Sequence, residues 1–282
     1  MKKDEINIRD PFVVYENGLY YMYGTRAKNF GVRTGGFDVY VSKDLNEWSE
    51  PIECFDSAKH ELNDGVNWAP EVHKYNDKYY MFASFTAKNG LHATYSLVSD
   101  TLTGPFKPNS NGPLTPDGWE CIDGTLYVDE QGIPYLVFCC EHTQITNGKI
   151  CYLRLNENLD SAVGDAVTLF KASECEWVDP IRDDHYVTDG PFMYRANSGD
   201  LFMIWSSFIG GKYAELIVKF KDGKFGTEFE HLKPMLDSDG GHGMIFSDEK
   251  NTYFTYHTPN TKLSERPEFC IAEYTGKTLS IK

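Results

Sequence analysis

Hydrophobic and polar residues form a sequence pattern that recurs five times along this chain. In each unit a residue that is usually polar is followed by Pro or Gly, a short apolar run, a turn, and a second apolar run rich in aromatic residues. The Pro or Gly of each unit stands at the following positions: Pro11, Pro70, Gly124, Gly190 and Gly243. The second runs are Leu19–Tyr23, Tyr79–Phe82, Tyr135–Phe138, Leu201–Ile204 and Tyr253–Tyr256. Such runs predict short strands joined by turns.

A third apolar run, followed by a turn, completes the visible part of each unit. These runs are Asp38–Ser42, Thr94–Val98, Lys149–Leu153, Ala214–Val218 and Phe269–Glu273. Periods of roughly 40–50 residues with several strands each are typical of β-propeller blades. No segment has a long helical period, so a short helix is expected only at Asp56–Leu62. The sequence therefore predicts an all-β, five-bladed β-propeller in which residues 1–282 form a single domain.

The residue before the Pro or Gly of each unit is the candidate for chemistry. The first strand of a propeller blade lies beside the central axis, so residues at its start face one channel. The ionisable residues at this position are Asp10, Asp123, Asp189 and His242. An Asp before Pro or Gly is commonly a turn former. Three Asp at one position of a repeat, however, need a reason to stay together, such as a shared proton, a metal or catalysis.

Composition narrows the choice of partners. The formal net charge is -15, which argues against nucleic acid and against an anionic membrane surface, because both are bound by basic faces. The seven cysteines include no CxxC pair, so no zinc site is expected. The chain starts without an apolar signal segment, and no run is long enough to cross a bilayer. These features predict a protein with reduced thiols and a cytoplasmic localisation.

Four segments, in this order along the chain, resemble the landmarks of glycoside hydrolase family 43. They are Ile8-Arg9-Asp10-Pro11, Trp68-Ala69-Pro70-Glu71-Val72, Ile122–Gly132 and Thr188–Phe192. The resemblance covers essentially the whole chain and implies a five-bladed propeller. It also implies hydrolysis of β-D-xylosides, α-L-arabinofuranosides or arabinans with inversion. Asp10 would be the general base, Asp123 would tune the pKa of the acid and orient it, and the acid itself would lie in the fourth blade.

The fourth-blade position departs from the pattern of that family. The family usually has Glu before Gly-Pro, and here the residue is Asp189. An inverting glycosidase needs one protonated carboxyl at the leaving oxygen and one carboxylate that activates water on the opposite face. Asp is one methylene shorter than Glu, and a misplacement of about 1 Å can cost roughly 100-fold in rate. We therefore expect either a compensating backbone or a slow enzyme, with Glu71 as the second candidate for the acid.

Substrate contacts are predicted at Glu71 and at four further residues. Trp68 is expected to stack on a sugar face, Phe30 to wall the sugar pocket, and Arg266 to donate hydrogen bonds to sugar hydroxyls. His242 resembles the axial histidine of the family, which contacts a central cation through water. A structural calcium or sodium ion in the channel is therefore a candidate, and no cofactor is required. The alternative interpretations are core packing for Trp68, an internal ion pair for Arg266 and a structural role for His242.

Two functions from different classes follow. The first is an inverting, exo-acting glycosidase for oligosaccharides that contain xylose or arabinose. The alternative is a non-catalytic carbohydrate-binding propeller in which the acid position has degenerated to Asp189. A glycoside phosphorylase is a third hypothesis, but it would need a cluster of Arg, Lys or His for phosphate, and none is evident near the repeat positions.

Overall fold

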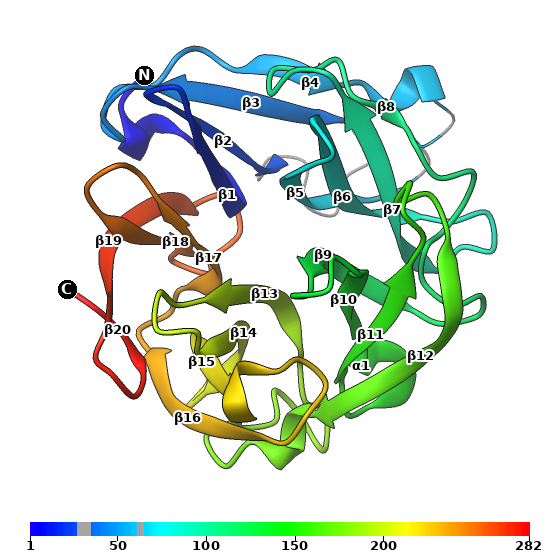
Figure 1. Cartoon of the computed structure of the whole chain (residues 1–282), viewed down its shortest axis with the longest axis vertical. Coiled ribbons are helices and arrows are strands. Elements are labelled where there is room, and N and C mark those ends of the chain that lie inside the picture. Colours follow the sequence, from blue (N-terminus) through cyan, green and yellow to red (C-terminus); the bar gives the residue numbers. More distant parts are fainter. Residues whose placement is uncertain (27–34, 61, 63–64) are drawn as a thin grey trace.

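Five four-stranded antiparallel sheets surround a central axis in the computed structural model of this chain (Figure 1). The structure describes residues 1–282 except 27–34, 61 and 63–64. Each sheet is built from one continuous stretch of sequence, and its strands follow chain order from the axis outward. The predicted five-bladed β-propeller is confirmed. Phe30, which was expected to wall the sugar pocket, lies outside the described residues.

The strands of the first two blades are β1 (Ile8–Glu16), β2 (Leu19–Arg26), β3 (Phe37–Ser42), β4 (Ile52–Phe55), β5 (Asn67–Tyr75), β6 (Lys78–Thr86), β7 (His92–Ser99) and β8 (Lys107–Pro108). Those of the third and fourth blades are β9 (Cys121–Val128), β10 (Pro134–Cys140), β11 (Lys149–Leu155), β12 (Ala162–Lys171), β13 (Asp189–Arg195), β14 (Leu201–Ile209), β15 (Lys212–Phe220) and β16 (Phe229–Leu236). The fifth blade contains β17 (Gly241–Ser247), β18 (Thr252–Thr258), β19 (Arg266–Tyr274) and β20 (Leu279–Ile281).

Helices are few and short. They are η1 (Lys3–Glu5), η3 (Ser57–His60), α1 (His142–Ile145), η4 (Ala172–Glu174) and η5 (Lys221–Gly223). The helix expected at Asp56–Leu62 is present as the 3-10 turn η3. Within the described part of the chain, none of the helices is long and apolar enough to span a membrane. All seven cysteines are free thiols, and six of them are buried.

The outer strand of each blade was not predicted from the sequence. β12 shows why, because most of its residues are exposed and no apolar alternation marks it. An outer strand has no blade beyond it, so little selects for a hydrophobic face there. The inner strands, by contrast, are apolar on both faces: Cys121–Val128 is buried at all but its last residue. Sequence patterns therefore identified the inner three strands of each blade.

The hydrophobic core lies mainly between neighbouring blades. One cluster joins the first and fifth blades through residues such as Phe12 and Met244, and a second joins the third and fourth through Val137 and Met203. Trp205 in β14 is completely buried. Because apolar burial contributes about 25 cal/mol per Å², these seams between blades hold the ring together.

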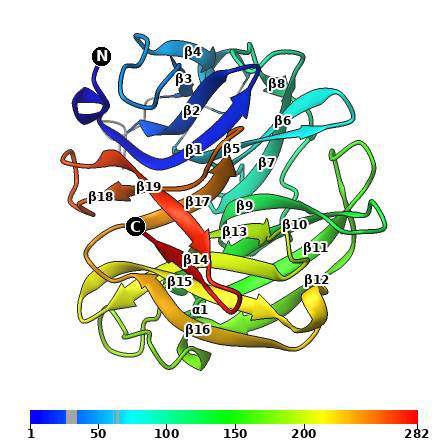
Figure 2. The ribbon, with the colours of Figure 1, turned by 60° about the vertical axis from the view of Figure 1, so that its left-hand side comes forward.

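Side chains, rather than an exchanged strand, close the ring between the first and last blades. β1 lies beside β17, β18 and β19 (Figure 2). Arg9 Nη1 pairs with Glu265 Oε1 at 2.9 Å, and the Glu265 carboxyl is completely buried. Lys3 Nζ pairs with Glu268 Oε1 at 2.9 Å, and Asn7 Nδ2 donates to the Glu265 carbonyl oxygen at 2.9 Å. The closure therefore places a buried ion pair directly beside Asp10.

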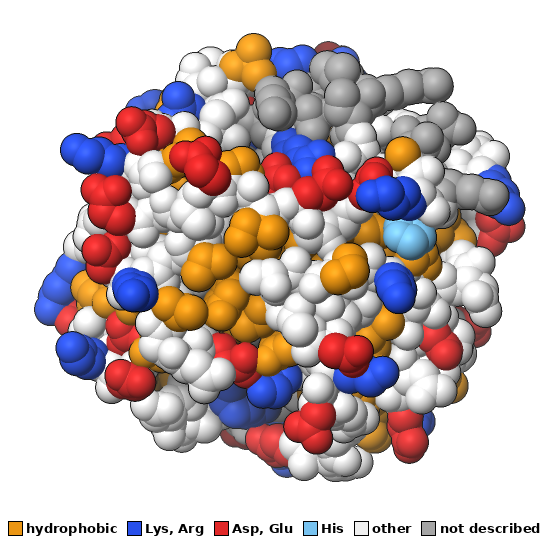
Figure 3. Space-filling model, turned by 90° about the horizontal axis from the view of Figure 1, so that it is seen from above, with side chains coloured by type: hydrophobic (Ala, Val, Ile, Leu, Met, Phe, Trp, Pro, Cys, Tyr) orange, Lys and Arg blue, Asp and Glu red, His pale blue; other side chains and the backbone are white. Residues whose placement is uncertain are grey.

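Acidic and basic side chains are interspersed on the face that carries β3 and β4, around a band of hydrophobic side chains (Figure 3). Basic side chains are not gathered into one patch in this view.

Candidate active site

Every inner strand begins with a bulge that has the same geometry. Two residues of the inner strand lie opposite one residue of the second strand, and the first of the two has a positive φ. These residues are Asp10 (φ 53°), Ala69 (φ 45°), Asp123 (φ 56°), Gly190 (φ 47°) and His242 (φ 50°). Gly, Asp and His tolerate this left-handed conformation better than most residues. The bulge bends the strand and aims the side chain at its head.

The bulge corrects one prediction from the sequence. In the fourth blade the positive φ belongs to Gly190, so Asp189 lies one residue before the position shared by Asp10, Asp123 and His242. Asp189 pairs with Ser206 as Arg9 pairs with Thr25, so these two residues occupy equivalent positions. The prediction placed Gly190 at the repeat position occupied by Pro11 in the first blade. In the structure Pro191 occupies that position. The channel is therefore lined by side chains from two successive positions of the repeat.

A cavity of about 460 Å³ opens at this end of the channel. It is lined by Arg9, Asp10, Trp68, Ile122, Asp123, Glu141, His142, Ile181, Val187, Asp189, Phe208, Tyr213, His242, Asn260 and Lys262. The fold thus gathers around one space five residues that the sequence singled out: Asp10, Trp68, Asp123, Asp189 and His242. These residues come from all five blades.

Asp10 is held as an ionised carboxylate. Its Oδ2 accepts a hydrogen bond from Thr25 Oγ1 at 2.6 Å, and its Oδ1 lies 3.2 Å from His242 Nδ1. Burial alone would raise its pKa, but the positive charges of His242 and Arg9 hold the pKa of Asp10 below its ordinary value. An ionised carboxylate in a cavity can accept a proton from water, which is the property of a general base.

A second histidine fixes the backbone of Asp10. The Asp10 N–H donates to His257 Nδ1 at 3.2 Å, so this nitrogen is the acceptor of a neutral imidazole. Burial lowers the pKa of His257 to about 3, which keeps the ring uncharged. The ring stacks on Tyr213, with centroids 5.6 Å apart. His257 therefore supports Asp10 without adding charge.

His242 carries the positive charge of the site. Its Nδ1 lies between Asp10 Oδ1 and Asp123 Oδ2, at 3.2 Å and 3.8 Å. Burial opposes protonation, but the surrounding carboxylates raise the pKa of His242 to about 9. Its backbone N–H donates to Ser206 Oγ at 2.6 Å, which anchors the head of β17 to β14. At neutral pH an imidazolium therefore lies between two carboxyl groups.

The remaining carboxyls of the cavity hold protons more readily. Burial raises the pKa of Asp123 to about 7, although its Oδ2 accepts the Gly190 N–H at 3.1 Å. Burial also raises the pKa of Asp189, whose Oδ2 accepts a hydrogen bond from Tyr213 at 2.9 Å. Glu141 behaves in the same way, with a pKa raised by burial to about 9. One ionised carboxylate thus faces three carboxyls whose pKa values are raised, and that of Glu141 lies well above 7.

The residues of the channel do not fit a metal ion bound directly by side chains. Among the described residues there is no group of three or more His, Cys, Asp or Glu arranged to hold one. His242 Nδ1 is already engaged with Asp10 and Asp123, and its proton supplies the positive charge that a cation would otherwise provide. A calcium or sodium ion contacted through water stays a prediction, and no step of the reaction is assigned to it.

Two predicted substrate contacts lie elsewhere. Glu71 is 5% exposed and its Oε2 lies 3.0 Å from His73 Nε2. Its charge helps to raise the pKa of His242, but Glu71 is not part of the described lining of the cavity. Arg266 donates to the carbonyl oxygens of Asp4 and Glu265, both at 2.8 Å. It binds backbone at the seam between the first and last blades, whereas its alternative interpretation was an internal ion pair. Neither residue is placed to contact a ligand in the cavity.

The cavity also contains residues that the sequence analysis did not identify as functional. Arg9, Glu141 and Tyr213 are the charged or hydrogen-bonding members of this set that contact or face the carboxyls. A signal for Glu141 does exist in the sequence: it follows the second strand of the third blade directly. In an antiparallel pair the end of the second strand lies beside the start of the first, and the first strand here starts next to Asp123.

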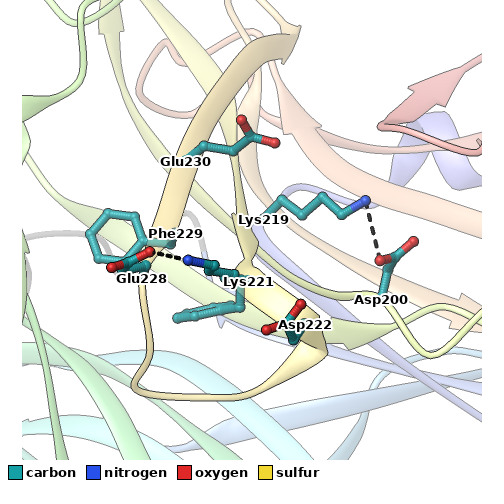
Figure 4. Close-up of a pocket in the computed structure, with 8 residues that line it drawn as sticks. Asp200, Lys219, Lys221, Asp222, Glu228, Phe229 and Glu230 are labelled. Carbon is teal, nitrogen blue, oxygen red and sulfur yellow. Dashed lines mark hydrogen bonds and ion pairs between the residues drawn. The ribbon is translucent and has the colours of Figure 1, made fainter.

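A separate hollow of about 460 Å³ lies on the fourth blade around β15, η5 and β16 (Figure 4). Four of its charged side chains form two ion pairs: Lys219 Nζ lies 3.2 Å from Asp200 Oδ1, and Lys221 Nζ lies 2.6 Å from Glu228 Oε2. Most of these side chains are exposed, so their electrostatic interactions are weak. Perturbed carboxyls gather instead in the axial cavity, which is therefore the candidate active site.

Gly190 gives a first test of this geometry. A Cβ on Gly190 would lie 2.6 Å from His242 Cδ2, so Gly190→Ala must displace the imidazole or the strand that carries residue 190. We expect a loss of roughly 100-fold or more in kcat/KM, because displacements of about 1 Å at a reacting centre have effects of that size. The matched control is Gly132→Ala, which also has a positive φ (79°) but open space around its Cβ. Equal activity of the two variants would contradict the proposed role of this contact.

Comparisons with known proteins bear on the family and the fold of this chain. The sequence profile of Glycosyl hydrolases family 43 matches residues 5–275. An endo-arabinase from Bacteroides thetaiotaomicron is 35% identical in sequence and superposes with a TM-score of 0.89, covering 98% of this chain and 97% of that chain.

Two curated proteins match over a shorter region. Extracellular endo-alpha-(1->5)-L-arabinanase 1 of Bacillus subtilis is 25% identical over 141 residues. Xylosidase/arabinosidase 43A of Humicola insolens is 26% identical over 143 residues. Each match covers 46% of this chain and 42% of the relative, so this chain matches less than half the length of either.

Proposed function

This chain belongs to the glycosyl hydrolases of family 43, and from that premise we propose that it is an inverting hydrolase of α-L-arabinofuranosides, β-D-xylosides or both. Its substrates would be oligosaccharides that contain these pentoses. The three similar proteins described above are an endo-arabinase that is 35% identical, an endo-α-(1→5)-L-arabinanase and a xylosidase/arabinosidase. Arabinofuranosides are therefore the first substrates to test.

One observation carries the proposal: the cavity holds carboxyls of unequal protonation. The pKa of Asp10 is lowered by His242 and Arg9, whereas burial raises the pKa of Asp123 and of Asp189. Glycosidases need a base and an acid at the same pH. They obtain both by placing neighbouring carboxyls in environments that shift their pKa values apart. A binding protein for a neutral sugar would not need this arrangement.

The proposed reaction uses a single displacement by water. Asp10 takes a proton from a water molecule, whose oxygen bonds to the anomeric carbon from one face. The bond from that carbon to the leaving oxygen breaks, and its electron pair receives a proton from a carboxylic acid on the other face. In the sequence-based assignment this acid is Asp189, while Asp123 repels negative charge and helps keep the acid neutral. The products are a sugar of inverted anomeric configuration and the released alcohol.

The remaining cavity residues suit a neutral sugar. Trp68 offers an aromatic face for a furanose ring. Asn260 and Tyr213 present side chains that can hydrogen-bond to hydroxyls. These roles are part of the proposal.

The test is hydrolysis of 4-nitrophenyl α-L-arabinofuranoside, 4-nitrophenyl β-D-xyloside and linear arabino-oligosaccharides by the wild-type chain. Proton NMR at early times should show the inverted anomer of the released sugar. If the first sugar released has the same anomeric configuration as the substrate, the inverting mechanism is contradicted. Binding of these sugars without any turnover would support the non-catalytic alternative instead.

A further inference from the structure

Glu141 is a carboxylic acid of the cavity whose role the sequence analysis left open. It follows the last residue of β10 and stands at the N-cap of the four-residue α1, without a side-chain hydrogen bond to that helix end. Its backbone N–H donates to the Glu120 carbonyl oxygen at 2.9 Å, which extends the pairing of β10 with β9 by one step. The side chain is thus not used in capping, and it lines the cavity that contains Asp10 and Asp189.

Strand geometry places this side chain beside the fourth blade. Side chains two residues apart on a strand point to the same side, so Glu141 and Cys139 share a direction. The Cys139 side chain lies close enough to Thr188, the residue directly before Asp189, for Thr188 to affect the pKa of the Cys139 thiol. Glu141 therefore extends towards the start of β13, next to the position where the proton donor is expected.

The surroundings of Glu141 favour its protonated form. Burial raises the pKa of Glu141 to about 9, and repulsion from Asp189 and Asp123 acts in the same direction. Glu120 adds a further negative charge, although its own carboxylate is paired with His92 Nδ1 at 2.7 Å. A neutral carboxyl at neutral pH is what a general acid requires.

Asp189 is less well suited to reach a leaving oxygen. It is one methylene shorter than Glu, and its Oδ2 accepts the hydroxyl hydrogen of Tyr213 at 2.9 Å. That hydrogen bond holds the carboxyl against the wall formed by β15. Glu141 has the longer side chain, lines the same cavity, and comes from the neighbouring blade.

We propose that Glu141 is the general acid of this enzyme and that Asp189 is a positioning residue whose charge keeps Glu141 protonated. This inference rests on the proposed function. As the bond from the anomeric carbon to the leaving oxygen breaks, the Glu141 carboxyl gives its proton to that oxygen and becomes a carboxylate. Asp10 accepts one proton from the attacking water. Exchange with solvent then returns a proton to Glu141 and removes one from Asp10, so the overall reaction consumes one water.

Leaving-group dependence tests the assignment. Glu141→Gln should lose roughly 100- to 1,000-fold in kcat on an arabino-oligosaccharide, whose leaving alkoxide needs a proton. The same variant should lose less than about 10-fold on 2,4-dinitrophenyl α-L-arabinofuranoside, whose phenolate leaves without one. Glu157→Gln, an exposed Glu of the same blade, is the matched control and should behave as wild type on both substrates.

The pH profile gives a second readout. The basic limb of kcat/KM reports the acid, so it should disappear in Glu141→Gln. In Asp189→Asn the basic limb should move to lower pH, because removing a negative charge lowers the pKa of Glu141. Glu141→Asp, which keeps a carboxyl, should recover part of the oligosaccharide activity and serves if the Gln variant does not fold.

The opposite pattern would overturn the assignment. If Asp189→Asn shows the selective loss on the oligosaccharide while Glu141→Gln keeps the wild-type profile, Asp189 is the acid and the proposed function stands. If the wild-type chain hydrolyses none of the pentosides, the proposed function fails, and the role of Glu141 fails with it.

Discussion

The Asp10→Asn variant is expected to lose roughly 1,000-fold or more in kcat/KM on every pentoside, irrespective of its leaving group. A general base contributes up to roughly 10⁴-fold in rate, and an amide cannot accept the proton of the attacking water. The change is nearly isosteric. Thr25 Oγ1, which donates to Asp10 Oδ2 at 2.6 Å, can still donate to an amide oxygen. Asn also tolerates the φ of 53° at this position.

Asp222→Asn is the matched control for this variant. Asp222 also has a φ of 53°, but it lies on the exposed surface of the fourth blade (Figure 4). We expect wild-type activity from it. Thermal midpoints of both variants show whether the folds are intact. If Asp10→Asn folds and retains more than a tenth of wild-type activity, Asp10 is not the base.

The His242→Gln variant is expected to affect both stability and the pH profile. Removing His242 leaves Asp10 buried without its closest positive charge, at a position where Nδ1 had been 3.2 Å away. Breaking a buried ion pair by deleting one partner costs about 3–5 kcal/mol in the free energy of unfolding. Burial then acts on Asp10 with less opposition, so its pKa rises. The acidic limb of kcat/KM should therefore move to higher pH.

The pH dependence of stability gives the sign of this effect. The pKa of His242 is raised from its ordinary value of 6.5 to about 9 in the folded chain. The stabilisation that it provides is therefore complete below pH 6.5 and is lost as the pH rises through about 9. Burial also raises the pKa of Asp123 and Glu141, which lowers stability over part of the same range. The wild-type thermal midpoint should fall from pH 6 to pH 9.

Melting curves at several pH values check this prediction. His242→Gln should have a lower midpoint than wild type at pH 6 and a flatter decline towards pH 9. His231→Gln is the control, because burial lowers the pKa of His231 and its ring packs against Phe170 and Phe229, away from the cavity carboxyls. His231→Gln should lower the thermal midpoint through lost packing, but it should not alter the acidic limb of kcat/KM. Parallel curves for wild type and His242→Gln would show that His242 is not charged in the folded chain.

The sequence identified the residues that lie at three of the bulges. Asp10, Asp123 and His242 were chosen because they recur before Pro or Gly, and all three lie at the left-handed residue of a bulge. The recurrence follows from local chemistry, because few residue types adopt this conformation readily. The blade number and the inner strands were predictable for a similar reason: apolar runs and turn residues are local signals.

Other features of the site depended on long-range contacts. Asp189 was assigned to the wrong position of the repeat because Gly190-Pro191 fits two alignments, and pairing with Ser206 decides between them. Glu141 was missed because its importance comes from facing β13, which starts 48 residues later in the chain. Glu71 pairs with His73 and is not part of the described lining of the cavity, and its sequence position alone did not show this.

The amino-acid sequence by itself determined the five-fold repeat, the strand order within each blade and the place of Asp10 among the candidate residues, because turn chemistry and strand patterning act over a few residues. The role of base for Asp10 came from the resemblance to the family. Only the tertiary structure decided which carboxyls share a cavity and which of them hold a proton. Those properties depend on burial and on charges contributed by other blades, and both exist only once the ring of blades has closed.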